Sequence, residues 1–400
     1  VSSGILGITN GQALGAVSGA LKLDGGTLVA AQVTSGTPVT DVTIAPERSV
    51  VLTNGKTSGM DAQSGLSLRY DGVIGEENGA GAAAGLRIGS SAARTGTVIL
   101  GGNNTYQGAT IVDFGTLSVA NIGNGGVASN LGAASNAASN LVLGGGTLQY
   151  TGNSASTDRS FTLSSNTSSG INVANSATTL TMSGGSAATS GALNKTGLGT
   201  LLLTGSNAHT GATNVEAGKL IVNGSTSGAS AVAVSSGATL AGSGAVGGNT
   251  TISNGGVLAP GNSPGVLTVS GTTALESGSI FDWELDTAQS NPTTNRGVAY
   301  DGINTTALTG TGAIFRIILT GTQDFSDSFW SVDRNWTDIF KSADGNTTLT
   351  NWASVFSGGF QYSYNGKTAK PPGPGSFTLT GNSLSWSAIP EPSNALAGLL

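Results

Sequence analysis

One stretch of the sequence occurs twice, and this repeat limits the possible folds more than any other feature. Gly96–Val119 and Gly199–Val222 align without a gap over 24 positions, and 12 of these are identical. The identical positions are mainly glycines and apolar residues two apart, which are typical of turns and of the buried face of a β-strand. The repeat therefore preserves a shape, and it indicates a solenoid-like architecture.

The duplication extends upstream of both copies. Each copy is preceded by the same two landmarks in the same order, a Gly-Gly-Thr-Leu segment and an acidic residue followed by Arg-Ser. They lie at Gly25–Leu28 and Glu47–Ser49 in one module, and at Gly145–Leu148 and Asp158–Ser160 in the other. Two modules, about residues 25–119 and 145–222, therefore share one plan. The spacing between their landmarks differs, which indicates loops of different length on a common scaffold.

A shorter period also recurs, in which glycine is followed by two apolar residues that are two apart, as at Gly218 and Gly265. The spacing of Leu220, Leu240 and Leu258 is about one rung of a solenoid of parallel strands. Because residues two apart in a strand share a face, each rung would point its apolar residues into one narrow core. We therefore predict an all-β fold, a right-handed parallel β-helix.

The composition agrees with this fold and excludes several functions. The chain has 400 residues, 65 of them glycine, and only 9% are charged. Its net charge of −6 argues against nucleic acid, which proteins bind through clustered Lys and Arg. The absence of cysteine excludes disulfides and thiolate metal sites, and we expect no cofactor. No run of 18 apolar residues crosses the sequence, and since the chain begins at Val1 we expect any signal peptide to have been removed already.

The second copy resembles the repeat of the autotransporter-associated β-strand repeat family, whose segment is similar to K-T-G-x-G-T-L-x-L-x-G-x-N-x-Y-x-G-x-T-x-V-x-x-G-x-L-x-V. His209 departs from this pattern, where the family and Tyr106 have an aromatic ring. The resemblance covers about residues 20–275 and implies a β-helical passenger on the cell surface. It says little about activity, because the motif is structural. The matching residues are Lys195, Thr196, Gly197, Gly199, Thr200, Leu201, Leu203, Gly205, Asn207, Gly211, Thr213, Val215, Gly218, Leu220 and Val222.

The composition changes past residue 275, where all five tryptophans lie. Strands are still predicted at Ser279–Leu285 and Ala313–Leu319, and a short helix is predicted around Asp333–Phe340. We expect residues 276–388 to form a β-rich, aromatic C-terminal cap that closes the end of a solenoid formed by residues 1–275.

The last residues, 389–400, resemble the PEP-CTERM sorting signal, in which Pro-Glu-Pro precedes an apolar segment and a basic end. Pro390, Glu391 and Pro392 match the tripeptide, but the apolar segment is short and the basic end is missing, so we expect a truncated or processed tail. The resemblance implies a secreted or outer-surface protein of a Gram-negative-type bacterium. It also implies transient membrane association through the tail, and exopolysaccharide or another surface matrix as a partner.

The chain shows no arrangement typical of an active site, which needs converging carboxylates or a base in a cleft. The single histidine, His209, aligns with Tyr106, and Glu216 aligns with Asp113. Because both occupy repeat positions, we interpret them as residues on the surface of a rung. We therefore assign no catalytic, cofactor-binding or metal-binding residue.

Three acidic residues, Asp282, Glu284 and Asp286, alternate along one predicted strand. They are candidate calcium ligands, because Ca²⁺ prefers oxygen donors, but a solvated strand face is the interpretation that we favour. Asp324 and Asp327 are interpreted as loop residues.

Two loops and one open strand edge complete the prediction. Gly75–Gly85 is expected to be an exposed loop, and Ala133–Ala138 a second loop with a short helix as the alternative. The β-prone segment Gly4–Thr9 has no charged residue before Lys22, so a strand edge there would have no obvious protection.

Three hypotheses for the function remain. The leading one is a non-enzymatic, extracellular structural or adhesive protein of the cell surface or biofilm matrix. The second is a self-assembling filament, in which protomers associate head to tail through strand edges at their ends or through the tail Ala395–Leu400. The third is a polysaccharide-active β-helix enzyme.

Overall fold

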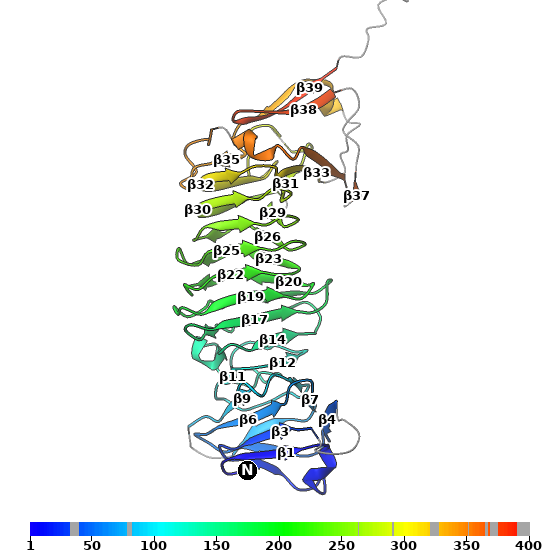
Figure 1. Cartoon of the computed structure of the whole chain (residues 1–400), viewed down its shortest axis with the longest axis vertical. Coiled ribbons are helices and arrows are strands. Elements are labelled where there is room, and N and C mark those ends of the chain that lie inside the picture. The colour runs from blue at the N-terminus through cyan, green and yellow to red at the C-terminus, as the bar shows by residue number, and fades with distance from the viewer. Residues whose placement is uncertain are drawn as a thin grey trace, which may run out of the picture. The chain divides into compact units, whose positions relative to one another are not determined.

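A computed structural model of the chain describes residues 1–32, 40–77, 82–262, 264–289, 292–320, 328–350, 352–364, 367–368 and 375–389. The chain forms two compact units, Val1–Ser230 (unit 1) and Ala231–Leu400 (unit 2). The described residues form β-strands and short 3-10 helices, and none of them is in an α-helix. Most strands pair in parallel within long sheets, so the predicted all-β, parallel β-helical fold is confirmed (Figure 1).

Unit 1 contains four stacks of parallel strands, and strands that follow one another along the chain mostly belong to different stacks. The first stack is β1 (Ile5–Ile8), β3 (Thr27–Ala30), β6 (Thr57–Ala62), β9 (Gly85–Ile88), β11 (Thr110–Val112), β13 (Leu141–Leu143) and β16 (Thr162–Leu163). The second stack is β4 (Asp41–Ile44), β7 (Ser67–Tyr70), β10 (Thr97–Leu100), β12 (Thr116–Val119), β14 (Thr147–Tyr150), β17 (Ser168–Val173), β19 (Ala192–Thr196) and β22 (Thr213–Val215).

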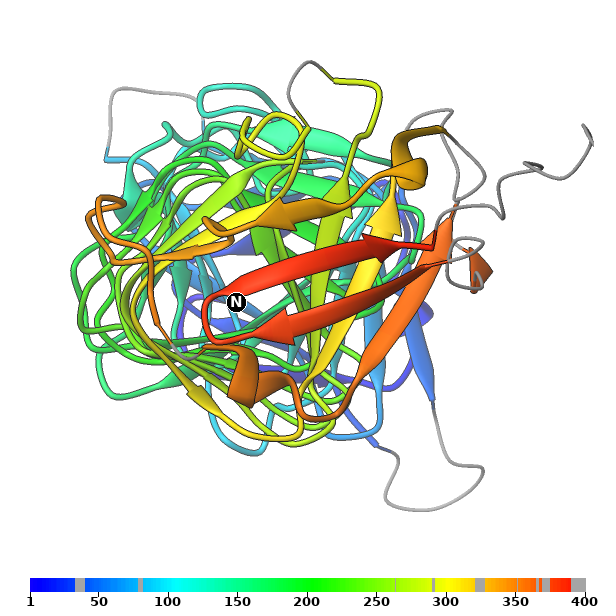
Figure 2. The same cartoon turned by 90° about the horizontal axis from the view of Figure 1, so that it is seen from above.

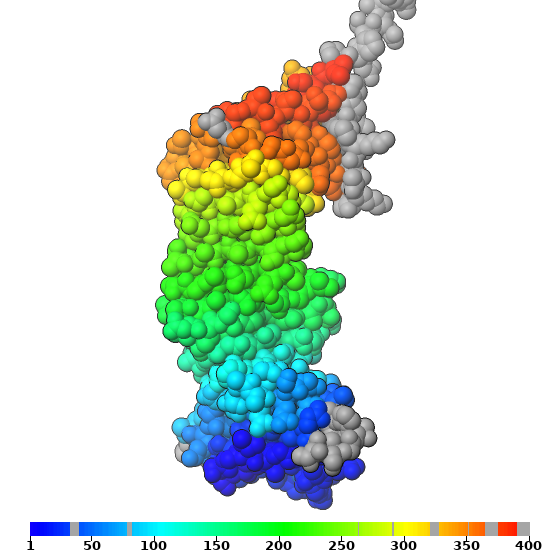
Figure 3. Space-filling view, viewed as in Figure 1, coloured from blue at the N-terminus to red at the C-terminus, as the bar shows by residue number. Residues whose placement is uncertain are grey.

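The two remaining stacks of unit 1 are smaller. One is β2 (Leu21–Leu23), β5 (Val50–Leu52) and β8 (Ile74–Glu76), and the other is β15 (Ala155–Thr157), β18 (Thr179–Met182), β20 (Thr200–Leu203) and β23 (Lys219–Val222). The short strands β21 (Ser206–Asn207) and β24 (Ser225–Thr226) pair with each other, and the 3-10 helices are η1 (Gly11–Leu14) and η2 (Ala138–Asn140). The colours of Figure 3 show that successive turns of unit 1 follow one another in chain order.

The register of these strands stacks apolar side chains into a continuous core. Leu201 pairs with Leu220, and Leu203 pairs with Val222, and all four side chains are completely buried. Leu202 lies between them in sequence and is half-buried on the outer side of the strand. The two-residue alternation seen in the sequence is therefore the alternation between core and surface.

The glycine before the last strand of each copy is required by its backbone. Gly115 and Gly218 have φ values of 66° and 63°, in the left-handed region that side chains disfavour. A Cβ atom on Gly218 would also lie 2.5 Å from the carbonyl oxygens of Gly197 and Gly199 in the rung beside it. The repeat preserves glycine here because the chain turns sharply against its neighbour.

The two copies of the repeat lie in different stacks. In the first copy β10 and β12 belong to the second stack and β11 to the first. In the second copy the corresponding strands β20 and β23 belong to the stack that begins at β15, and β22 belongs to the second stack. The motif therefore specifies which residues are buried in a rung, and not the stack into which a strand falls.

Unit 2 continues the parallel arrangement and adds an antiparallel sheet. Its first parallel group contains β25 (Val232–Val234), β27 (Ala245–Val246), β28 (Thr250–Ile252), β30 (Val266–Leu275), β32 (Gly302–Gly310) and β35 (Phe340–Lys341). Its second group is β26 (Thr239–Gly242), β29 (Val257–Pro260), β31 (Ile280–Leu285), β33 (Ile314–Leu319) and β36 (Phe360–Tyr364), with β37 (Lys367–Thr368) antiparallel to β36. The antiparallel sheet is β34 (Arg334–Trp336), β39 (Ser383–Ala388) and β38 (Gly375–Thr380), and the 3-10 helices are η3 (Ser328–Ser331) and η4 (Trp352–Phe356).

Aromatic rings fill the core of unit 2 beneath this antiparallel sheet. Trp283 on β31 meets Trp336 on β34 with ring centroids 5.2 Å apart, and Trp386 on β39 meets Trp330 at 5.2 Å. All four rings are at most 4% exposed. Figure 2 shows the hairpin of β38 and β39 lying across the strands of unit 2. Parallel pairing runs on through β36, beyond residue 275, and the domain boundary expected there stays a prediction.

The predicted helix around Asp333–Phe340 is wrong. This segment contributes two strands, β34 and β35, and Trp336 pairs with Leu384 of β39. In the expected loop at Ala133–Ala138, only Ala138 is helical, as the first residue of η2. In the loop expected over Gly75–Gly85, Gly75 and Glu76 belong to β8, and residues 78–81 lie outside the described residues.

Candidate functional site

Unit 1 buries charged side chains that would normally be exposed. Arg48, Asp61, Arg159 and Lys195 are each at most 3% exposed. A buried charge is costly unless hydrogen bonds satisfy it, so the partners of these side chains show what they do. In every case most of the partners are main-chain groups at loops and turns.

Arg159 binds the carbonyl oxygens of one long loop, residues 121–137. Its three nitrogens donate to five carbonyl oxygens of this loop, at distances between 2.8 and 3.4 Å. The acceptors are Gly123, Asn124, Val127, Gly132 and Ala134. Burial lowers the pKa of Arg159, but a guanidinium stays protonated in proteins. The loop is therefore closed around a fixed positive charge.

The neighbouring carboxylate holds the tip of the same loop. Asp158 Oδ1 accepts a 2.7 Å hydrogen bond from the Gly125 amide, and Oδ2 accepts from the Asn136 side chain at 3.3 Å. Val127, near the tip, is 54% exposed. The tip thus presents an apolar side chain from a backbone that is fixed on both sides.

Arg48 repeats this arrangement in the first module. It donates to the carbonyl oxygens of Gly19 at 2.6 Å, Gly15 at 2.7 Å and Ala16 at 3.0 Å, in the loop formed by residues 10–20. Val17 on this loop is 50% exposed. We call the loops 10–20 and 121–137 the arginine-anchored loops. The sequence showed the Arg-Ser landmark in both modules, but nothing in it showed that the arginine reaches back to a loop.

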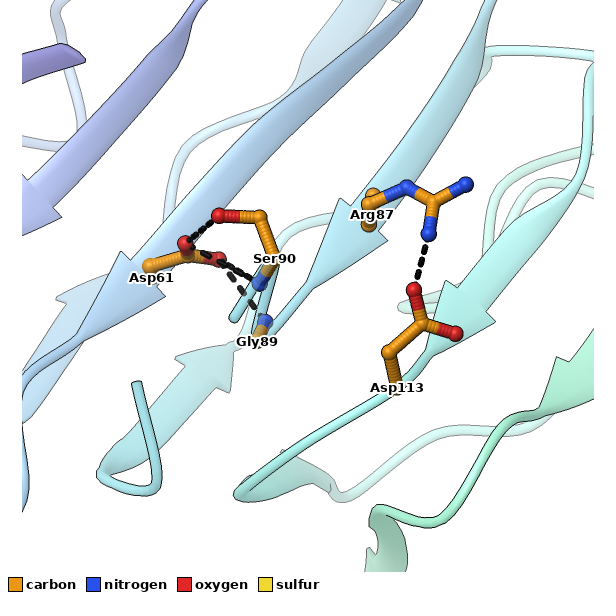
Figure 4. A network of polar contacts seen from close by, with 5 residues as sticks. All are labelled: Asp61, Arg87, Gly89, Ser90 and Asp113. Carbon is orange, nitrogen blue, oxygen red and sulfur yellow. Dashed lines mark hydrogen bonds and ion pairs between the residues drawn. The ribbon is translucent and has the colours of Figure 1, made fainter. Parts of the chain in front are cut away.

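A second polar group ties three consecutive rungs together (Figure 4). Asp61 on β6 accepts hydrogen bonds from the Gly89 amide at 2.7 Å and from the Ser90 hydroxyl at 2.5 Å, just after β9. Arg87 on β9 forms an ion pair with Asp113, which follows β11. The Arg87 side chain is 40% exposed, so this pair contributes little stability on its own. The buried carboxylate of Asp61 is the stronger tie, because it satisfies main-chain amides that have no other partner in the turn.

Lys195 does the same for the turn of the second repeat copy. Its ammonium group donates to the carbonyl oxygens of Thr196 at 2.7 Å, Gly197 at 2.9 Å and Ala217 at 3.0 Å. Burial lowers its pKa to about 8. The lysine of the repeat motif is therefore a cap for turn carbonyls and is not available for chemistry at the surface.

His209 lies in the core, so its interpretation as a surface residue is wrong. Its side chain is fully buried, with Nδ1 2.9 Å from the Ser186 hydroxyl and Nε2 2.9 Å from the Thr213 hydroxyl. Burial lowers its pKa to about 4, so it is neutral at pH 7. The equivalent Tyr106 is also buried and is 2.8 Å from the Thr110 hydroxyl. Both copies thus place a ring beside the threonine four residues later.

Glu216 is exposed, as expected for a surface residue of a rung. It follows β22, where the chain leaves the second stack. His209 is enclosed in the core, so it does not form a catalytic pair with the exposed carboxylate of Glu216.

The acidic strand of unit 2 differs from the solvated face that we favoured. Asp282 is only 8% exposed and forms a two-point ion pair with Arg316, at 2.6 and 2.7 Å. Because a guanidinium occupies this carboxylate, it is not free to bind Ca²⁺. Among the described residues, no group of three or more His, Cys, Asp or Glu side chains could hold a metal ion. Asp324 and Asp327 lie outside the described residues.

Asp301 is a buried carboxylate beside this strand. It accepts hydrogen bonds from the Gly265 amide at 2.7 Å and the Glu284 amide at 2.9 Å, and it is fully buried. Burial and then the nearby Glu284 charge raise its pKa well above the usual value. A raised pKa is typical of a general acid, but both Asp301 oxygens are occupied by the main chain and neither reaches the surface. The group therefore organises the backbone around Trp283, whose indole N–H donates to the Asp301 carbonyl at 3.1 Å.

The described residues contain neither a membrane-spanning helix nor the tripeptide of the predicted sorting signal. Within the described part of the chain, no helix has the length and apolar character needed to cross a bilayer. Pro390, Glu391 and Pro392 lie outside the described residues, so the sorting signal stays a prediction.

Comparison with known proteins supports the repeat but covers only part of the chain. Residues 95–119 and 193–222 match the family model described as passenger-associated-transport-repeat, and these segments contain both copies of the internal repeat. A protein named adhesin BmaC autotransporter, from Brucella suis biovar 1 (strain 1330), is 46% identical over 162 residues. That alignment covers 40% of this chain and only 5% of the relative's length. The chain is thus similar, over these segments, to repeats of autotransporter passengers.

Proposed function

We propose that this protein is a non-enzymatic adhesive protein displayed on the outer surface of a bacterium. The similarity to an adhesin autotransporter and to passenger-associated repeats supports this function. We also propose that the protein is part of the biofilm matrix, because Pro390, Glu391 and Pro392 resemble a sorting signal.

The observation that carries the proposal is the use of the buried ionisable groups. Arg48, Asp61, Arg159 and Lys195 bond main-chain groups at loops and turns, and His209 is enclosed in the core. These ionisable side chains therefore stabilise the shape of the loops and turns and are not exposed for catalysis. A rigid, repetitive surface suits binding, because little freedom is lost when a partner docks.

The test is adhesion of the purified chain without turnover. Beads coated with the protein should attach to bacterial or matrix-coated surfaces, whereas beads coated with albumin should not. The same protein, incubated with a panel of neutral and acidic polysaccharides, should release no sugar. Sugar release that is abolished by substitution of one exposed carboxylate, such as Glu216→Gln, would show that the protein is an enzyme, and beads that do not attach would contradict the adhesive function.

One observation favours a second candidate, a filament subunit. β1 pairs with β3 on one edge, and on the other edge it has no partner strand among the described residues. Ile5 and Leu6 of this strand are 63% and 38% exposed. An uncharged open edge of this kind can add a strand from another molecule.

Electron microscopy at high protein concentration decides between the two candidates. A filament built on β1 should be abolished by Leu6→Lys, because a charge at an open edge blocks strand addition. Val127→Lys, which places the same charge on an arginine-anchored loop, is the matched control and should leave filaments intact. Uniform single particles of the unmodified protein would exclude assembly.

A further inference from the structure

One surface of unit 1, distinct from the arginine-anchored loops, has a chemistry of its own. Strands β12, β14, β17, β19 and β22 are consecutive neighbours in the second stack (Figure 1). Their inward side chains are buried, and most of the alternate side chains are partly exposed, although Ser118 of β12 is only 6% exposed. We call this outer surface the amide-hydroxyl face. Its side chains include Thr116, Thr147, Gln149, Asn194 and Asn214.

The amide-hydroxyl face lies in a part of the chain that has almost no charge. Between Phe114 and Leu275 the only charged residues are Asp158, Arg159, Lys195, Glu216 and Lys219. Arg159 and Lys195 are buried and bonded to the main chain. Of the others, only Glu216 adjoins a strand of the face, at its β22 end. The face therefore offers hydrogen-bonding groups but almost no charged side chains.

Most polar side chains of this face form no hydrogen bond with another side chain or with the main chain. The one side-chain hydrogen bond among them joins the Asn214 Nδ2 donor to the Asn194 Oδ1 acceptor at 2.9 Å. In the described part of the chain, the side chains of Thr116, Thr147 and Gln149 form no hydrogen bond with another residue. By contrast, Asn104 in the same unit both donates and accepts within the protein. The face thus holds donors and acceptors at fixed positions whose partners are supplied by solvent or by a ligand.

This chemistry identifies the class of ligand. Nucleic acid and acidic polysaccharides need Lys or Arg, and the face has none. A protein partner needs buried anchors such as Trp, Tyr or Arg, which the face also lacks. A neutral polysaccharide needs amides and hydroxyls that can both donate and accept, and these are the groups present.

We propose that the amide-hydroxyl face binds an uncharged polysaccharide laid along the direction in which the strands stack. Neighbouring strands are about 4.8 Å apart, so Thr116 and Thr147, and Asn194 and Asn214 on the far side of Gly170, lie at that interval along the stack. Each contact is weak, but contacts to one continuous chain add up because the later ones form within the same complex. This inference rests on the proposed adhesive function, and it names the ligand class and the surface that would serve it.

The test is binding of the full chain to insoluble glucan, mannan and galactan, with polygalacturonate as the acidic comparison. Asn194→Asp keeps the acceptor for Asn214 but adds a charge, and it should weaken binding at least tenfold. Thr147→Val keeps the shape of the side chain but removes its hydroxyl, and it should weaken binding about threefold. Asn382→Asp, on the exposed turn between β38 and β39, is the control and should bind as the unmodified chain does. Binding should also be unchanged by salt, because no charge takes part.

The proposal is overturned if the chain binds no neutral polysaccharide, or if it binds polygalacturonate as tightly as a neutral one. It is also overturned if Asn194→Asp and Thr147→Val bind like the unmodified chain. Finally, sedimentation that shows copies of the chain associating through an Asn194-dependent contact would assign the face to self-association instead. Coated beads separate this proposal from the broader one. Beads that attach equally well with and without Asn194→Asp would contradict the polysaccharide-binding face but would still support the adhesive function. Beads that never attach, although the protein binds polysaccharide in the Asn194-dependent manner, would remove adhesion and leave the face.

Discussion

Buried charged side chains in unit 1 share one role, which is to bond the main chain where it leaves a strand. Arg159 satisfies five carbonyl oxygens, Lys195 satisfies three, and Asp61 accepts from two amides. A β-solenoid has many turns, and each turn leaves main-chain groups that no neighbouring strand can pair. A long charged side chain is an efficient partner for such groups, because one side chain serves several of them.

The first prediction concerns Arg159. Arg159→Met should destabilise the protein by about 3 kcal/mol or more, because several buried carbonyl oxygens lose their donors. Hydrogen exchange should show the loss first in residues 121–137. Arg69→Met is the matched control, since Arg69 has a 49% exposed side chain in a surface ion pair with Asp71 and should cost less than about 1 kcal/mol. Equal effects of the two substitutions on chemical denaturation would contradict the structural role of Arg159.

The second prediction concerns His209 and pH. Burial lowers its folded pKa to about 4, against an ordinary value of 6.5, so the unfolded chain binds a proton more readily. The contribution of neutral His209 is therefore complete above pH 6.5 and is lost as the pH falls toward 4, by about 3 kcal/mol in total. His209→Tyr should remove this pH dependence, because Tyr106 occupies the equivalent site beside Thr110. The free energy of unfolding of both proteins between pH 7 and pH 4 is the measurement, and parallel curves would show that His209 is not the source.

The location of His209 could have been predicted from the sequence. Its alignment with Tyr106 showed a repeat position, and a large ring at a repeated position is typical of a core. We interpreted it as a surface residue because, like Glu216, it occupies a repeat position. The hydroxyls of Ser186 and Thr213, which make a polar ring acceptable in the core, lie on neighbouring segments whose contacts the sequence does not display.

At the scale of the element, the strands and turns of the repeat were predictable because their signals are local. Apolar residues two apart marked the buried face of β20 and β23, and glycine marked the turn before β23. The segment of β34 was not predictable in this way. Trp336 and Phe340 are four residues apart and mimic a helical pattern, but Trp336 lies in a strand because it pairs with Leu384, far away in the sequence. A contact of that range overrides local preference.

The third prediction tests the turn glycines. Gly218→Ala should cost several kcal/mol, because φ is 63° and the new Cβ would meet two carbonyl oxygens at 2.5 Å. Gly65→Ala is the matched control, since φ is 79° there but no atom lies within 4 Å of the added Cβ. It should cost only about 1 kcal/mol, for the backbone conformation alone. Midpoints of urea denaturation that agree for the two variants would show that close packing of the turn is unimportant.

For the whole molecule, the sequence predicted the kind of fold and the kind of function better than any site. Repeats report a shape, and shape was what the glycines and leucines preserved. The arginine-anchored loops and the amide-hydroxyl face depend on which segments lie side by side, and loop lengths that differ between modules hide that information. The acidic strand is the plainest case, because Asp282 is paired only when β33 brings Arg316 to it.

We propose that the chain binds through a fixed surface and performs no chemistry on what it binds. A quartz microbalance coated with a neutral polysaccharide measures both parts of this claim in one experiment. We expect a gain in mass when the protein is added, and a return to the original mass when the protein is washed off with denaturant. A layer that gains no mass, or one that remains lighter than before because sugar was released, would contradict it.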